Sequence, residues 1–147
     1  MRRLVLAAGL AAVLLTVLAV GSATALVLAP PVPVTGSATA VTTTTATLNG
    51  TVDPVGSATD YSFQYGTTTA YGQATPTQSA GSALVAGPVS APVTGLTPGT
   101  TYHFRLVATP TGGGTAVDGL DQTFTTNGAP VVTTGPATAI APTAATL

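Results

Sequence analysis

Residues 89–108 constrain the fold more than any other part of this 147-residue chain. Two runs of alternating apolar and polar residues stand on either side of a short segment rich in Gly and Pro. Alternation with a period of two is typical of β-strands that bury one face. Tyr102 begins the second run, and a Tyr at such a corner packs its ring inward while its hydroxyl bonds to the backbone a few residues upstream. We therefore predict a structural corner between two strands, made by Leu96, Pro98, Gly99 and Tyr102.

Short alternating runs separated by turn residues fill the rest of residues 32–126. With the two runs above they predict seven strands, the other five at 32–35, 46–52, 60–65, 71–77 and 120–126. Residues 78–82 and 109–119 are predicted loops, the second a flexible one built on consecutive glycines. We expect a core made mainly of aromatic side chains, namely Tyr61, Phe63, Tyr65, Phe104 and Phe124. No helical periodicity occurs, so the predicted fold class is all-β, an immunoglobulin-like seven-stranded β-sandwich.

Several of these motifs resemble the fibronectin type III family. The spacing of the corner residues is similar to that between the family's E and F strands, and Tyr61-Ser-Phe63-Gln-Tyr65 is similar to its C strand. The segments Ala-Thr-Leu-Asn-Gly-Thr-Val-Asp-Pro and Tyr-Gly-Thr-Thr-Thr-Ala-Tyr-Gly resemble a bacterial branch found in repetitive secreted and surface proteins. The resemblance implies one complete module over residues 32–126. The chain departs from the family where Val52 lies near the place of a usual core Trp, so we expect a smaller core.

The first 25 residues have the organisation of a secretory signal peptide. Arg2 and Arg3 precede an uncharged apolar run at 4–20, and Ala23-Thr24-Ala25 supplies small residues for cleavage. We expect cleavage after Ala25, and the alternative is an uncleaved membrane anchor. Residues 26–31 are a Pro-rich lead-in to the domain.

A repeat begins after the domain. Residues 31–41 recur without gaps as residues 130–140, and Ala46-Thr47-Leu48 recurs as Ala145-Thr146-Leu147. The offset of about 99 residues is a normal length for one sandwich module with its linker. Residues 127–147 are therefore predicted to be a linker and the start of a second, incomplete repeat, and we expect a longer tandem array with residues after Gly128 loosely docked.

The scarcity of charge excludes several function classes. Charged residues make up only 5% of the chain, and none of them form a basic patch that could neutralise a row of phosphates. We therefore exclude nucleic acid as a partner. Cysteine is absent, which excludes disulfides and thiolate metal sites. We expect no metal and no cofactor.

Three side chains are candidates for a surface binding site: Tyr71, His103 and Arg105. Strand parity places His103 and Arg105 on the outer face of their sheet. A catalytic His needs a nucleophile and an orienting group in reach, and no carboxylate shares its strand, so we favour a non-catalytic surface residue. Tyr71 could offer an aromatic platform to a sugar, or it packs against an edge strand. Asp118 and Asp121 match no calcium-loop spacing and are predicted to solvate a loop.

These observations predict a non-catalytic structural, spacer or interaction module of a secreted or surface-displayed bacterial protein, not an enzyme. Two alternatives stay open: an accessory module of an extracellular hydrolase whose catalytic domain lies outside this chain, and an adhesin or carbohydrate-binding module. The expected partners are cell-wall or extracellular polysaccharide, or neighbouring domains of the same chain. No membrane contact is expected after signal cleavage. Function follows sites rather than folds, and the sequence contains no catalytic constellation.

Overall fold

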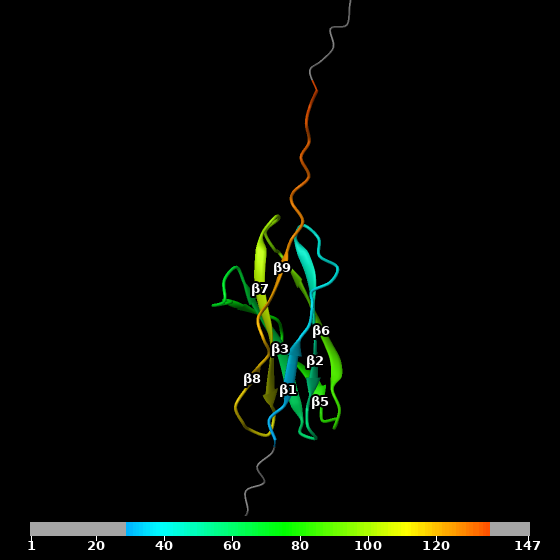
Figure 1. Cartoon of the computed structure of the whole chain (residues 1–147), viewed down its shortest axis with the longest axis vertical. Helices are drawn as coiled ribbons and strands as arrows, with labels where there is room; N and C mark the ends of the chain where they lie inside the picture. The colour runs from blue at the N-terminus through cyan, green and yellow to red at the C-terminus, as the bar shows by residue number, and fades with distance from the viewer. Residues whose placement is uncertain (1–28, 136–147) are drawn as a thin grey trace, which may run out of the picture.

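Short strands and tight turns build two antiparallel β-sheets in the computed structural model, which describes residues 29–135 (Figure 1). The smaller sheet has the order β1-β2-β6, with β1 at Val32–Thr35, β2 at Thr45–Asp53 and β6 at Gly87–Thr94. The larger sheet is centred on the long pair β3 (Thr59–Gly66) and β7 (Thr101–Pro110). The two sheets pack face to face, so the predicted all-β, immunoglobulin-like sandwich is confirmed.

Four short elements complete the larger sheet as two interrupted edge strands. Both β4 (Gln73–Ala74) and β5 (Gln78–Gly81) pair with β3, and both β8 (Val117–Asp118) and β9 (Gln122–Thr125) pair with β7. Counted by position, the nine elements of the described region therefore occupy the seven strand positions that the sequence predicts. The described residues contain no helix, and so none that is long and apolar enough to cross a membrane.

Aromatic rings fill the space between the sheets. Phe63 and Phe104 are fully buried, Tyr61 and Tyr102 nearly so, and Phe124 is 9% exposed. Edge-to-face and tilted contacts connect them, with ring centroids 5.8 to 6.5 Å apart, in the range that favours aromatic pairs. Val52 is buried among them, as the smaller predicted core requires. The expectation for Tyr65 is wrong in part: it packs against the core but is only half-buried, because it lies one residue before the end of β3.

The predicted corner between β6 and β7 is confirmed. The hydroxyl of Tyr102 accepts a hydrogen bond from the backbone N–H of Thr97 at 3.0 Å. The Tyr102 ring stacks on Phe124 with 5.6 Å between centroids, and Leu96 is 4% exposed. Pro98 precedes Gly99, whose φ of 63° lies in the left-handed region that favours glycine. The corner thus joins a buried ring to an exposed turn.

One predicted loop is wrong, and a second is predicted too long. Residues 78–81 form β5, because the exposed edge of β3 offers backbone partners to a segment whose small side chains show no alternation. Within 109–119, β7 continues to Pro110 and β8 forms at Val117–Asp118. The predicted strand at 120–126 is correspondingly too long, since Leu120 is 83% exposed and β9 begins at Gln122.

The chain enters and leaves the sandwich at opposite ends (Figure 1). Residues 29–31 lead into β1 at one end, and residues 126–135 leave from the other, where residues 128–135 are exposed and form no strand. The predicted signal peptide at 1–25 and the later part of the predicted repeat, 136–147, lie outside the described residues. So do residues 26–28 of the lead-in.

Candidate functional site

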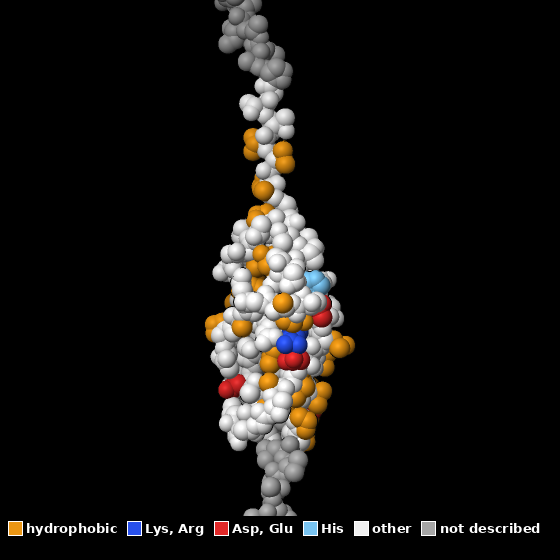
Figure 2. Space-filling view, turned by 90° about the vertical axis from the view of Figure 1, so that its left-hand side faces the viewer, with side chains coloured by type: hydrophobic (Ala, Val, Ile, Leu, Met, Phe, Trp, Pro, Cys, Tyr) orange, Lys and Arg blue, Asp and Glu red, His pale blue; other side chains and the backbone are white. Residues whose placement is uncertain are grey.

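Four of the six Asp, His and Arg side chains of the described region belong to one connected set on the outer face of the larger sheet. His103 and Arg105 alternate along β7 with buried Tyr102, Phe104 and Leu106, so they point away from the core as predicted. Figure 2 shows this face, where the blue group touches a red one and the pale blue histidine lies above them. We call the connected set Gln64, Tyr71, His103, Arg105, Asp118 and Asp121 the polar network.

Arg105 connects three elements of the sheet. Its Nη1 lies 2.7 Å from Oδ2 of Asp118 on β8, and its Nε donates to Oε1 of Gln64 on β3 at 2.9 Å. The guanidinium carbon stands 4.8 Å from the centroid of the Tyr71 ring, within cation–π range. Arg105 therefore has three partners while its side chain remains 29% exposed.

Asp121 connects the other half of the network. Its Oδ2 lies 2.8 Å from Nδ1 of His103, and its Oδ1 accepts a hydrogen bond from the Tyr71 hydroxyl at 3.0 Å. Asp121 lies between the end of β8 and the start of β9, so the alternation of side chains along a strand does not fix which face of the sheet its side chain points to. It joins β7 to the turn that follows β3.

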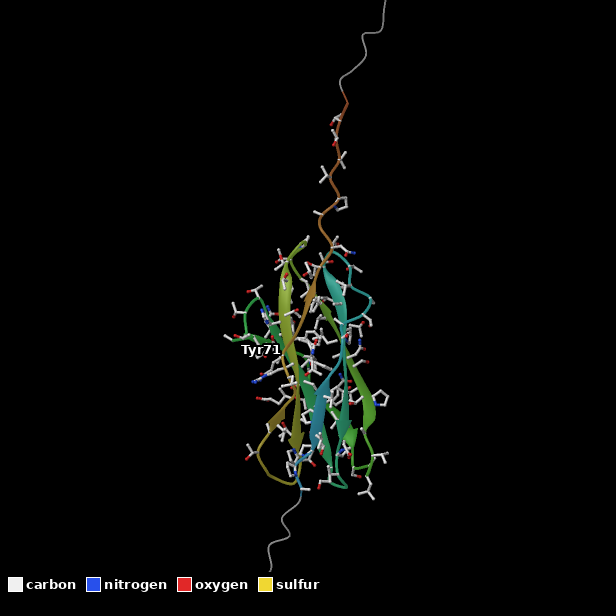
Figure 3. The ribbon with its side chains drawn as sticks, in the orientation of Figure 1. Tyr71 is labelled. Atoms are coloured by element: carbon white, nitrogen blue, oxygen red, sulfur yellow. The ribbon has the colours of Figure 1, made fainter. Side chains whose placement is uncertain are left out.

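The turn between β3 and β4 positions Tyr71. Its φ of 59° is unusual for an aromatic residue, and it directs the side chain across the sheet (Figure 3). Gly66 makes this possible, because any Cβ at that position would overlap the carbonyl oxygen of Tyr71. Partial burial, together with the hydrogen bond to Asp121 and that carboxylate's negative charge, raises the pKa of the Tyr71 hydroxyl above its ordinary value of 10.0. The hydroxyl is therefore protonated at neutral pH and donates to Asp121.

A shallow groove of about 480 Å³ lies beside this tyrosine. Its walls come from β3, β4, the turn between them and β7, and they include Gln64, Thr69, Tyr71, Gln73 and Arg105. Amide, hydroxyl and guanidinium groups thus border one aromatic ring. Such a combination suits a neutral, hydroxyl-rich ligand, which can stack on the ring and exchange hydrogen bonds with the amides.

His103 and Asp121 form a hydrogen-bonded pair on this face. A catalytic arrangement of this kind has a nucleophile bonded to a His that a carboxylate orients. Among the described residues, the side-chain hydrogen bond of the His103 ring is the one that Nδ1 makes with Asp121. In the described region, 29–135, no cluster of three or more metal-ligating side chains is present. The arrangement can bind a polar ligand or hold strands together.

The structure brings the three predicted candidates together and adds three residues. Gln64 stands directly opposite Arg105 in the β3–β7 register, so cross-strand pairing could have revealed it. Asp118 and Asp121, predicted to solvate a loop, instead form an ion pair with Arg105 and a hydrogen bond with His103, respectively. No sequence pattern signals this role, because it depends on the break between β8 and β9. The corner residues Leu96, Pro98, Gly99 and Tyr102 take no part in the network.

Comparisons with known proteins show the fold alone. No family model matches the chain, and a search of curated proteins gave no match. Among solved structures, the short form of the sensor domain of the anti-sigma factor RsgI4 from Pseudobacteroides cellulosolvens is similar, with 24% identity and a TM-score of 0.53 over 69% of this chain and 99% of that chain. The solution structure of the same sensor domain has 21% identity and a TM-score of 0.54, over 76% and 92% of the two chains.

Proposed function

We propose that the chain provides a non-catalytic β-sandwich module of the fibronectin type III kind, which acts as a spacer in a secreted or surface-displayed protein. The observation that carries this proposal is the placement of the two ends, since the chain enters and leaves at opposite ends of the long axis (Figure 1). A module of this shape adds its full length to a string and keeps its neighbours apart. The tyrosine corner and the repeated segment after the domain support the same proposal.

The test is intact mass and N-terminal sequencing of the native protein, isolated separately from culture fluid and cell envelope. We expect a product that begins at Leu26 and is long enough for several modules. A product that ends at Leu147 would refute the tandem array, and a product confined to the cytoplasm would refute the secreted location. A catalytic domain found after the modules would replace the spacer role with that of an accessory module of a hydrolase.

A binding role has one specific observation in its favour, the groove beside Tyr71. Its aromatic ring and surrounding amides suit an extracellular or cell-wall polysaccharide, and a sandwich of similar fold is the sensor domain of the anti-sigma factor RsgI4. Pull-down on insoluble cell-wall polysaccharide should retain the protein, and Tyr71→Ala should abolish retention. Leu84→Ser is the matched control, because Leu84 is 79% exposed and lies outside the groove. Equal retention of both variants would refute binding at the groove.

A further inference from the structure

Two residues at the end of the first strand, Thr35 and Gly36, make contacts that depend on their residue type. The hydroxyl oxygen of Thr35, on β1 of the smaller sheet, accepts a hydrogen bond at 3.1 Å from the buried N–H of Leu106 on β7. Gly119 leaves space for this hydroxyl, because a Cβ there would overlap it. Gly36 donates its N–H to the carbonyl of Asn49 at 2.8 Å, and a Cβ at Gly36 would come within 3.2 Å of that oxygen. Thr35 and Gly36 therefore cannot be replaced freely.

The segment after the domain keeps both residues, as Thr134 and Gly135. Within residues 31–41 it also keeps three further positions that make contacts in the first copy. Fully buried Pro31 recurs as Pro130, and buried Pro33 is replaced by the apolar Val132. Thr39 recurs as Thr138; in the first copy its hydroxyl accepts a hydrogen bond from the side-chain amide of Asn49. Within residues 31–41, the substitutions to a different chemical type occur where the first copy is exposed, with Val34 replaced by Thr133 and Ser37 by Pro136. The following β1–β2 loop is not kept, since Thr42 and Thr45, whose hydroxyls bond to each other, become Ala141 and Ala144.

The end of the domain fixes the direction in which the chain leaves. Thr126 donates its hydroxyl to the carbonyl of Thr97 at 2.6 Å and accepts from the N–H of Thr100 at 2.9 Å. Asn127 donates its backbone N–H to the carbonyl of Thr42 at 2.9 Å and accepts from the N–H of Gly99 at 3.0 Å. The Asn127 side chain adds a hydrogen bond to the Val41 carbonyl at 3.3 Å. Asn127 therefore binds the β1–β2 loop of one sheet and the β6–β7 corner at the same time.

We propose that the surface around Asn127, formed by residues 42–44 and 95–100, is the seat of a second copy of this module that follows in the same chain. This inference rests on the proposed function. Only Gly128 and Ala129 lie between Asn127, which is bonded to the first module, and Pro130, the counterpart of a buried residue in the second. Three Cα–Cα steps separate Asn127 from Pro130, which span at most about 11 Å, so the facing ends of the two modules must lie close together.

The seat suits an end-to-end contact between copies of this chain. Residues 42–44, 95–100 and 126–135 include no charged residue, so Asp53, which pairs with Val32 at the entry end of a second copy, would meet no like charge there. The exposed backbone of the corner and of the β1–β2 loop offers polar groups to a neighbour. Asn127 is the positioning residue, because its bonds to both sheets hold the linker at a single exit angle.

The experiment uses the chain from residue 26 to Leu147, extended by a copy of residues 49–127 that completes the second repeat in register. Backbone order parameters of Gly128 and Ala129 and the rotational correlation time of each module are measured by NMR relaxation. We expect order parameters near the value of about 0.85 for rigid backbone, and both modules tumbling as one body. Asn127→Pro, which removes the backbone N–H bonded to Thr42 together with the side-chain amide bonded to Val41, should lower them toward the flexible value of about 0.6. Gln78→Ala, which alters an exposed amide far from the linker in sequence, should change nothing.

Three outcomes would overturn the inference or its basis, and they can be told apart. Independent tumbling, equal to that of a variant with Gly-Ser-Gly-Ser inserted after Gly128, would refute the seat while leaving the spacer function intact. Rigid tumbling that is unaffected by Asn127→Pro would refute the role of Asn127. Small-angle scattering that shows the two modules folded back side by side would refute the spacer function itself.

Discussion

Replacing Tyr102 by Phe tests the corner with a single-atom change. The substitution removes the hydroxyl oxygen that accepts the Thr97 N–H at 3.0 Å and leaves the ring in place. That ring is 6% exposed and stacked on Phe124, so the core packing should be unchanged. The measured loss of stability then reports the hydrogen bond that holds the corner closed.

The expected cost follows from the surroundings of that bond. A neutral hydrogen bond contributes about 1 kcal/mol net, and a donor left without a partner costs about 1–3 kcal/mol. Because Thr97 is exposed, water reaches its N–H in part, so we expect a loss of about 1.5 kcal/mol. For a domain of this size, each kcal/mol lowers Tm by about 4–8 °C, so Tm should fall by about 6–12 °C.

Urea unfolding followed by circular dichroism measures this loss, and an unchanged m-value would show that the two folded states are alike. Tyr71→Phe is the matched control, since it removes the same atom from an exposed hydrogen bond to Asp121 and should cost about 0.5 kcal/mol or less. If Tyr102→Phe costs no more than this control, the corner bond does not stabilise the fold and our reasoning is refuted.

Three further changes test other contacts. Because the pKa of Tyr71 is raised above 10.0 in the folded protein, the hydroxyl stabilises the fold fully below about pH 10, and this stabilisation is lost as pH rises through the raised pKa. The unfolding free energy of Tyr71→Phe should therefore decline less at alkaline pH than that of the unaltered protein. Parallel curves of unfolding free energy against pH would contradict this. Gly66→Ala should cost about 3 kcal/mol in chemical unfolding, because its Cβ meets the Tyr71 carbonyl, and a neutral effect would show that the turn moves freely. Thr35→Val should lower the free energy of unfolding by about 2 kcal/mol and speed hydrogen exchange at the Leu106 amide, because that amide loses its hydrogen-bond acceptor. Unchanged exchange at Leu106 would contradict this.

The sequence predicts those parts of the fold that depend on side-chain periodicity. The first strand has the bounds predicted, and Phe63, Phe104 and Phe124 are buried as alternation requires. Tyr102 is likewise predictable, because its partner lies only five residues away. Each of these features is set by residues close together in sequence, where one face of a strand must meet the core.

Edge strands are harder to predict, because their partners are backbone groups. The segment Gln78–Gly81 has small polar side chains without alternation, yet it pairs with β3 through main-chain hydrogen bonds that any residue can make. The break between β8 and β9 has the same origin. There Leu106 bonds to Gly119 and Thr35 instead of to a continuous strand, a contact between residues 71 positions apart in the case of Thr35.

The polar network could be predicted only in part for the same reason. Parity places His103 and Arg105 on the outer face, and register adds Gln64 opposite Arg105. Asp121 lies 18 residues from His103 and 50 from Tyr71, and it reaches both because it stands in the break between two short strands. A site that depends on an irregularity of the fold leaves no periodic trace in the sequence.

One path of contacts joins the core to the exit of the chain. Phe124 stacks on Tyr102, the Tyr102 hydroxyl holds the N–H of Thr97, and the carbonyl of Thr97 accepts the hydroxyl of Thr126. Asn127 is the next residue, and its backbone N–H donates to the carbonyl of Thr42 in the β1–β2 loop of the smaller sheet. Because the bonds that stabilise the corner also hold the last residues of the domain, the exit angle cannot change without loosening the fold. In the tandem arrangement proposed above, such a module would set the orientation of its neighbour through the same contacts that keep it folded.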